Sequence, residues 1–145
     1  MMRSVAVLVV GGGPGGLVAA RFAAEEGRGL EVLLVERDRA IGAPVRCAEG
    51  VGGPGLREFL EPRGADWVSR EIHRIVLVAP DDSETVLETP EPPYILDRLR
   101  FEPVLADAAR RAGAELRIGT EVTALRRAGD RWVATVRGPH GEEEI

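Results

Sequence analysis

The sequence has no lysine, only one cysteine and few aromatic residues, which make up 4% of the chain. Every basic side chain is an arginine, and the 19 basic residues are outnumbered by 24 acidic ones. The net charge of −5, without a cluster of basic residues, argues against a nucleic-acid partner. The single Cys47 excludes an internal disulfide, and His73 and His140 are too few for a zinc cluster, so we expect no metal site.

Long apolar segments are also missing. The longest wholly apolar run, residues 5–10, is far shorter than the roughly 20 residues that cross a bilayer. It ends in glycines and a proline, not in the small-residue cleavage site of a secretory signal, so we expect a cytoplasmic protein. With 145 residues, 44% of them hydrophobic and 30% charged, the chain has the size and composition of one globular domain.

Residues 5–16, VAVLVVGGGPGG, form the most informative segment that is present. Gly11, Gly13 and Gly16 have the spacing of the dinucleotide-binding fingerprint, in which a buried strand turns sharply into a helix. Gly11 permits the tight turn, Gly13 lets the backbone approach a ligand, and Gly16 lets the helix pack closely on the strand. Pro14 has no N–H, so the N–H groups of Gly15 and Gly16 are the expected donors to a diphosphate.

The flanking sequence favours this interpretation over an ordinary strand-to-helix loop. Residues 5–10 predict a parallel strand covered on both faces, and a helix-forming stretch follows that ends at Gly27. A second apolar run, EVLLVE, ends at Glu36, which lies 20 residues after Gly16. A carboxylate there can accept hydrogen bonds from the ribose hydroxyls of adenosine, and it would repel a 2′-phosphate. The segment therefore predicts a site for FAD or NAD rather than NADP.

After Glu36 the pattern departs from that of a simple nicotinamide dehydrogenase, which continues with another helix and parallel strand. Residues 37–55 are rich in glycine, proline and arginine, and residues 56–62 predict a short helix. Two apolar runs around residues 80–83 predict an antiparallel hairpin.

The last part of the chain predicts a second helix over residues 102–112, with Pro103 suitable for its first helical position and Gly113 at its end. A strand and another hairpin, turning at residues 128–130, follow it. The predicted fold class is α/β, with an incomplete FAD/NAD(P)-binding Rossmann-like three-layer core and an antiparallel β excursion. We interpret residues 1–145 as one domain in which residues 37–100 are the loop-rich and antiparallel excursion. Trp67 and Trp132 are expected to be packing residues.

Several of these segments carry a family resemblance. VVGGGPGG, EVLLVERD, IGAPVRCAEGV and YILDRLRFEPVLADAARRAGAEL resemble the amino-terminal third of the geranylgeranyl reductase family. That family consists of FAD flavoproteins related to the aromatic hydroxylases of the p-hydroxybenzoate type. The resemblance covers nearly the whole chain, and its specific part is residues 44–50, because the glycine turn is generic.

The resemblance implies a set of cofactor contacts. Gly13, Gly15 and Gly16, with Gly11 at the turn, would meet the diphosphate, and Glu36 the adenosine ribose, with Arg37 beside it. Other contacts would come from a second group of residues: Arg46, Cys47, Ala48 and Gly50 near the flavin and ribityl chain, Arg98 near the ribityl chain or diphosphate, and the backbone of Val122 at the adenine edge.

The resemblance also implies an activity. Such proteins take electrons from a reduced donor, here unidentified, and saturate isolated double bonds in the isoprenoid chains of membrane lipids, chlorophyll or quinones. The substrate would then be a prenyl lipid or another hydrophobic small molecule, and peripheral membrane contact would come from regions beyond this sequence. Cys47 is the candidate proton donor; its alternative role is that of a small buried apolar residue. Arg46 and Arg98 have the alternative role of surface arginines.

Complete members of this family are longer and close the FAD site with a later Gly-Asp segment, which we expect beyond Ile145. We therefore expect an amino-terminal portion that is inactive by itself, and the alternative is a degenerate stand-alone domain. Two other functions compete with a prenyl reductase: an FAD-dependent monooxygenase of aromatic rings, and a nonenzymatic domain that binds FAD or NAD.

Overall fold

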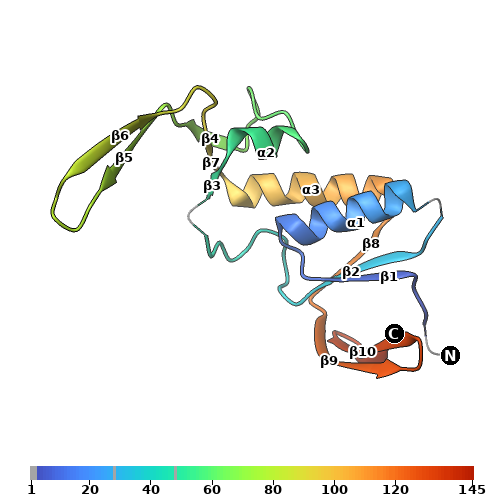
Figure 1. Cartoon of the computed structure of the whole chain (residues 1–145). Coiled ribbons are helices and arrows are strands. Elements are labelled where there is room, and N and C mark those ends of the chain that lie inside the picture. Colours follow the sequence, from blue (N-terminus) through green and yellow to red (C-terminus); the bar gives the residue numbers. More distant parts are fainter. Residues whose placement is uncertain (1–2, 28, 48) are drawn as a thin grey trace. The chain divides into compact units, whose positions relative to one another are not determined.

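The computed structural model describes residues 3–27, 29–47 and 49–145 (Figure 1). The chain divides into two compact units: residues 1–44 with 102–145 form unit 1, and residues 45–101 form unit 2. Unit 1 contains β1 (Val7–Val10), α1 (Pro14–Glu26), β2 (Val32–Glu36), β8 (Glu115–Ile118), β9 (Glu121–Ala128), β10 (Arg131–Gly138) and β11 (Gly141–Glu144). Unit 2 contains β3 (Gly50–Val51), α2 (Gly53–Arg57), β4 (Val68–Glu71), β5 (Arg74–Val78), β6 (Glu84–Glu88) and β7 (Tyr94–Leu96). Helix α3 (Arg98–Ala112) starts in unit 2 and continues into unit 1.

The middle layer of unit 1 is a parallel sheet in the order β1-β2-β8. Helix α1 is the crossover between β1 and β2, as the glycine turn and the following helical stretch predict. Strand β2 lies in the centre, and residues 32–35 are each at most 1% exposed. Its last residue is Glu36, so the sequence placed the acidic residue correctly at the carboxyl end of this strand.

Two further layers cover this sheet. Leu33 and Val35 of β2 pack against Ala134, Val136 and Ile145 of the antiparallel sheet β9-β10-β11. Because side chains alternate along a strand, the intervening residues of β2 face the other way, toward α1. Figure 1 shows α1 and α3 on one face of the parallel sheet and β9 and β10 on the other. The predicted three-layer α/β core is therefore confirmed.

Several local predictions need correction. Strand β1 is not fully covered on both faces, since residues 7–9 are only partly buried and Val10 is 56% exposed. The short helix expected at residues 56–62 lies instead at Gly53–Arg57, with Pro54 in its first turn, where proline is favoured. Trp132 is 65% exposed and is not a packing residue.

Helix α3 begins four residues before its predicted start, so Pro103 lies inside the helix and not at its first position. Asp97 caps this earlier start, because its Oδ1 accepts hydrogen bonds from the N–H groups of Leu99 and Arg100. The helix ends at Ala112, and Gly113 follows with φ +105°, the left-handed conformation that the sequence predicted for a helix stop.

Unit 2 contains a small antiparallel sheet in the order β3-β7-β4 and a separate hairpin, β5–β6. Tyr94 and Leu96 of β7 are buried, and the ring of Trp67 packs on that of Phe101 with centroids 5.1 Å apart. The hairpin and its turn at residues 80–83 agree with the prediction. No helix among the described residues is long and apolar enough to cross a membrane.

A chain of ion pairs joins the first residues of unit 1 to β8 and β11. Arg3 contacts Glu31 at 2.8 Å and Glu115 at 2.6 Å, and Arg117 contacts Glu115 at 2.8 Å and Glu143 at 2.6 Å. The hydrogen bond from Arg3, followed by that from Arg117, lowers the pKa of Glu115 from 4.5 to about 2. The hydrogen bonds of Arg3 with Glu115 and then with Glu31 raise the pKa of Arg3.

We expect the stabilisation from Glu115 to depend on pH. Because its pKa is lower in the folded chain, its contribution is fully present above pH 4.5 and is lost as the pH falls toward 2. The Arg3–Glu115 ion pair is partly exposed, so Glu115→Gln should lower the free energy of unfolding by only about 1 kcal/mol at pH 7. Urea denaturation at pH 7, 4 and 3 should show this difference narrowing. A difference that grows as the pH falls would contradict the role given to Arg3.

Candidate functional site

The glycine turn lies between the end of β1 and the start of α1. The N–H of Gly11 donates to the carbonyl oxygen of Val35 at 2.8 Å, which extends the parallel pairing by one residue. Gly11 then adopts φ +103°, so the chain can leave the sheet sharply at a conformation that other residues rarely adopt. Gly13 is the N-cap of α1, and the first intrahelical bond is from the Leu17 N–H to the Gly13 carbonyl.

The two faces of the turn differ in the space that they leave. A Cβ on Gly16 would overlap the carbonyl oxygen of Gly11, so α1 packs directly on the turn at this point. Cβ atoms on Gly13 and Gly15 would meet nothing within 4 Å, and both residues are exposed. The N–H groups of Gly15 and Gly16 precede the first intrahelical bond, so they have no acceptor within the helix. The start of α1 therefore presents donors and partial positive charge to an anion.

Glu36 lies beside this turn and is held by main-chain donors. Its Oε2 accepts the Gly12 N–H at 2.5 Å, and its Oε1 accepts the Asp38 N–H at 2.7 Å. A Cβ on Gly12 would lie 2.6 Å from Cδ1 of Ile41 and 3.0 Å from Cβ of Glu36. Gly12 is thus a functional residue that the sequence reasoning missed, because the fingerprint assigns roles only to its neighbours. The middle glycine of GGG, together with the acid at the end of β2, was the available signal.

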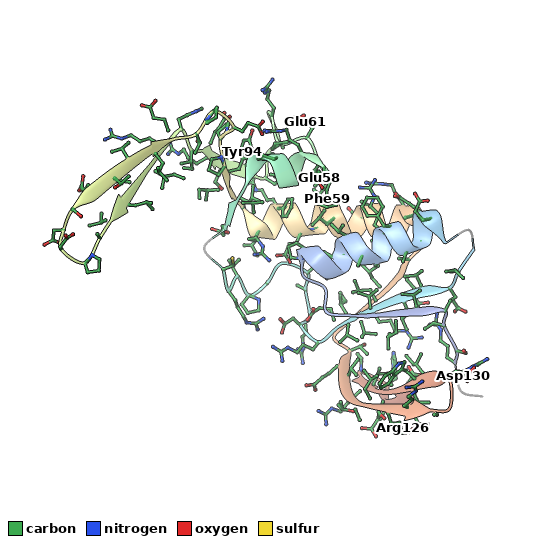
Figure 2. All side chains as sticks on the ribbon, viewed as in Figure 1. Glu58, Phe59, Glu61, Tyr94, Arg126 and Asp130 are labelled. Atoms are coloured by element: carbon green, nitrogen blue, oxygen red, sulfur yellow. The ribbon has the colours of Figure 1, made fainter. Side chains whose placement is uncertain are left out.

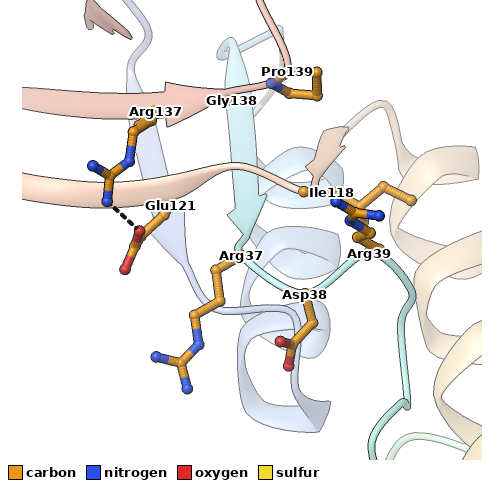
Figure 3. A pocket seen from close by; sticks show the side chains of 9 residues that line it. Arg37, Asp38, Arg39, Ile118, Glu121, Arg137, Gly138 and Pro139 are labelled. Carbon is orange, nitrogen blue, oxygen red and sulfur yellow. Dashed lines mark hydrogen bonds and ion pairs between the residues drawn. The ribbon is translucent and has the colours of Figure 1, made fainter. Parts of the chain in front are cut away.

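A cleft of about 670 Å³ opens where the chain leaves β2 (Figure 3). Two main-chain hydrogen bonds join the chain after β2 to the chain after β8: the Thr120 N–H donates to the Glu36 carbonyl at 2.8 Å, and the Gly119 N–H donates to the Asp38 carbonyl at 2.9 Å. The cleft is lined by residues from four segments of unit 1: Arg37, Asp38, Arg39, Ile118, Gly119, Glu121, Arg137, Gly138 and Pro139.

The charges in the cleft are partly satisfied within the chain. Arg137 pairs with Glu121 at 2.9 Å across β9 and β10, as Figure 3 shows. Arg37 has no ion-pair partner among the described residues and extends from the chain directly after Glu36. Val122 follows Glu121, and its side chain packs against the core of unit 1. Unit 1 thus brings together Glu36, Arg37, the glycine turn and the strand that contains Val122.

The other predicted site residues belong to unit 2. Arg46 and Cys47 are exposed, so the alternative of Cys47 as a buried apolar residue is wrong. Ala48 lies outside the described residues. Gly50 opens β3, and Arg98 is the first residue of α3. Glu49 joins the chain before β3 to the end of β7 and the start of α3. Its carbonyl accepts the Leu96 N–H at 3.0 Å, and its Oε1 accepts the Arg98 N–H at 3.3 Å.

The residues of unit 1 fit the adenosine and diphosphate end of a dinucleotide. The open side of the turn has no Cβ to keep a diphosphate away, and the helix donors there have no acceptor within the helix. Each Glu36 oxygen accepts one N–H, and a carboxylate oxygen has a second acceptor position that a ribose hydroxyl can use.

Comparison with known proteins agrees with this geometry. The family model described as "FAD binding domain" matches residues 4–145. The digeranylgeranylglycerophospholipid reductase of Methanosphaerula palustris is 48% identical over 122 residues, which cover 81% of this chain and 30% of that protein. The structure of a geranylgeranyl bacteriochlorophyll reductase-like protein from Thermoplasma acidophilum is 31% identical with a TM-score of 0.88, covering 100% of this chain and 38% of that one.

The p-nitrophenol 4-monooxygenase of Pseudomonas putida shares the fold at a TM-score of 0.76 with 18% identity, covering 99% of this chain and 39% of that one. This chain therefore spans about a third of the length of the proteins that it matches. The predicted resemblance to geranylgeranyl reductases and the predicted cofactor FAD are both confirmed. The chain belongs to the family of FAD-binding domains.

Proposed function

We propose that this chain is the FAD-binding portion of a flavin-dependent reductase that saturates isoprenoid double bonds in prenyl lipids. One observation carries the proposal: the 48% identity to a reductase named for a digeranylgeranyl phospholipid. The monooxygenase neighbour is 18% identical, which supports a common fold and not a common reaction.

In this proposal the glycine turn binds the diphosphate of FAD. The N–H groups of Gly15 and Gly16 donate to phosphate oxygens, and Gly13 lets the backbone approach them closely. Gly11 and Gly16 hold the turn and helix in the required position. The absence of side chains on the open side of the turn supports these roles.

Glu36 binds the ribose of the adenosine, and the N–H groups of Gly12 and Asp38 orient its carboxylate before FAD binds. Arg37 covers the adenosine from the adjacent cleft, since its guanidinium has no competing ion pair among the described residues. The backbone of Val122 pairs with the adenine edge. Support for this last role comes from the register shift next to Val122, which leaves Thr123 without a ladder partner on β10, because irregular pairing can leave main-chain groups of a strand available to a ligand.

The residues of unit 2 serve the flavin end. Arg46, Cys47, Ala48 and Gly50 approach the flavin and ribityl chain, and Arg98 contacts the ribityl chain or diphosphate. Reduced FAD, when bound, supplies a hydride to one carbon of the double bond. Cys47 donates the proton from its Sγ to the other carbon, and the exposure of this thiol supports access to a substrate.

The substrate class also suggests where the enzyme works. A prenyl phospholipid is held in a membrane, so we propose a cytoplasmic enzyme with peripheral membrane contact that receives electrons from a separate reduced donor. The first relative's name supports the phospholipid and leaves the donor open.

A chimera tests the proposed reaction. This chain would replace the matched segment of the Methanosphaerula palustris reductase, and the product would be loaded with FAD and reduced with dithionite. Mass spectrometry of a geranylgeranyl-chain lipid should show addition of one H₂ per saturated double bond, and Cys47→Ala should reduce the rate about 100-fold. Substrate-coupled oxygen uptake with an aromatic compound, without lipid reduction, would instead establish a monooxygenase.

A further inference from the structure

Glu49 adopts a backbone conformation that glutamate rarely uses. Among the non-glycine residues that the structure describes, φ is positive at Glu49 (+64°) and at Asp82 (+63°). Asp82 lies in the turn of the β5–β6 hairpin, where the short side chain of aspartate tolerates this left-handed conformation. Glutamate has no such local reason, and the glycine that the conformation favours is the next residue, Gly50. Contacts with another part of the chain must therefore hold Glu49 in place.

Those contacts come from the end of β7 and the start of α3. The Glu49 carbonyl accepts the Leu96 N–H at 3.0 Å, and Oε1 of Glu49 accepts the Arg98 N–H at 3.3 Å. The pairing of β3 with β7 continues from this point, since Val51 pairs with Tyr94, which is labelled in Figure 2. Glu49 is thus held through both its main chain and its side chain, and both partners belong to unit 2.

The first turn of α3 shares its main-chain donors between two carboxylates. Oδ1 of Asp97 accepts the N–H groups of Leu99 and Arg100, the second and third residues of the helix. The N–H of Arg98, the first residue, donates to Glu49 instead. Asp97 is adjacent to the helix and caps it locally. The bond from Glu49 spans 49 positions of the sequence, so it fixes the start of α3 against the segment that precedes β3.

These two segments are the ones that the proposed function assigns to the flavin end of FAD. The segment 46–50 approaches the flavin and ribityl chain, and Arg98 contacts the ribityl chain or diphosphate. Because they are far apart in sequence, short-range structure does not fix the distance between them. A displacement of about 1 Å at a reaction site can cost about 100-fold in rate, so this distance matters to a shared ligand.

We propose that Glu49 is a positioning residue of the flavin site, which holds the segment 46–50 and Arg98 at the spacing that the flavin end of FAD requires. It acts through the Arg98 N–H and does not touch the cofactor. Glycine at this position would remove the backbone strain and would also remove the Oε1 acceptor. The proposal rests on the proposed function, which assigns these residues to the flavin end.

Three variants of the chimera with the Methanosphaerula palustris reductase test this role. Glu49→Gly should weaken FAD binding about tenfold and change ADP binding by about threefold or less, because the proposed ADP contacts lie in unit 1. Glu49→Gln keeps an Oε1 acceptor and should bind FAD within about threefold of the parent chimera. Asp82→Gly is the matched control, since it relieves the same backbone conformation in the hairpin turn and should leave both affinities unchanged.

Calorimetric titration into the FAD-free chimera measures these affinities, and visible circular dichroism of the bound flavin should change in Glu49→Gly alone. Both glycine variants should keep the thermal midpoint within about 3 °C of the parent, since glycine adopts positive φ without strain.

The proposal would be overturned if Glu49→Gly bound FAD as tightly as the parent chimera, or if it lost FAD and ADP affinity equally. An equal loss of FAD affinity in Glu49→Gln or Asp82→Gly would overturn it as well. A parent chimera that binds FAD without reducing lipid would contradict the proposed function alone, because the comparison of affinities does not depend on turnover.

Discussion

Replacing Glu36 with alanine should weaken FAD binding by about 100-fold and leave FMN binding unchanged. The carboxylate is held beside the glycine turn by the N–H groups of Gly12 and Asp38, so it is oriented before the cofactor arrives. Hydrogen bonds to a charged acceptor contribute about 1.5–3 kcal/mol each, and the loss of about 2.7 kcal/mol corresponds to a factor of 100. FMN has no adenosine and cannot make these bonds.

Calorimetric titration of both flavins into Glu36→Ala and the parent chain measures this difference. Glu121→Ala is the matched control, because Glu121 is an acid at the nearby cleft whose carboxylate pairs with Arg137. We expect it to change FAD affinity by about threefold or less, as for an exposed ion pair. Equal losses for FAD and FMN, or a larger loss with Glu121→Ala, would show that Glu36 does not bind the ribose.

Alanine at Gly16 should have the largest combined effect on folding and FAD binding. Its Cβ would overlap the Gly11 carbonyl oxygen, which is a main-chain atom and cannot move away as a flexible side chain could. Relief requires α1 to shift from the turn, at a cost of about 1–3 kcal/mol of folding free energy, as for overpacked cores. The same shift displaces the donors at the helix start, so FAD affinity should fall by at least about tenfold.

Gly13→Ala separates the effect on folding from the effect on FAD binding. A Cβ at Gly13 meets no atom of the chain within 4 Å, and its φ of −75° suits alanine. The free energy of unfolding should therefore change by about 1 kcal/mol or less. FAD affinity should still fall about tenfold, because the methyl group lies where the diphosphate is proposed to approach. Urea denaturation measures the first effect and FAD titration the second. If Gly13→Ala bound FAD as tightly as the parent chain, the diphosphate would not approach at Gly13.

The part of the fold that sequence could predict is the part governed by local rules. The positive φ of Gly11, the close packing at Gly16 and the position of Glu36 at the end of β2 all follow from spacing along a continuous strand-helix-strand unit. The β5–β6 hairpin was predictable for the same reason, since its turn residues separate two apolar runs. These features depend on residues that are near one another in sequence.

Predictions from sequence failed where two local preferences competed, or where contacts between distant segments determined the environment of a residue. Pro103 favours the first turn of a helix, but the side chain of Asp97 caps an earlier start, and the capped helix tolerates the proline inside it. The role of Gly12 depends on Ile41 and Glu36, which approach it only in the folded chain. Trp132 occupies an exposed strand position that composition alone does not reveal.

Titration of ADP into the ¹⁵N-labelled chain, followed by amide chemical shifts, locates the nucleotide without requiring the flavin end of the site. If adenosine and diphosphate bind as proposed, the largest shifts will be those of Gly12, Gly15, Gly16 and Asp38, and Glu36→Ala will abolish them. Binding of ADP with its largest shifts on residues outside unit 1, unaffected by Glu36→Ala, would show that the glycine turn is not the cofactor site.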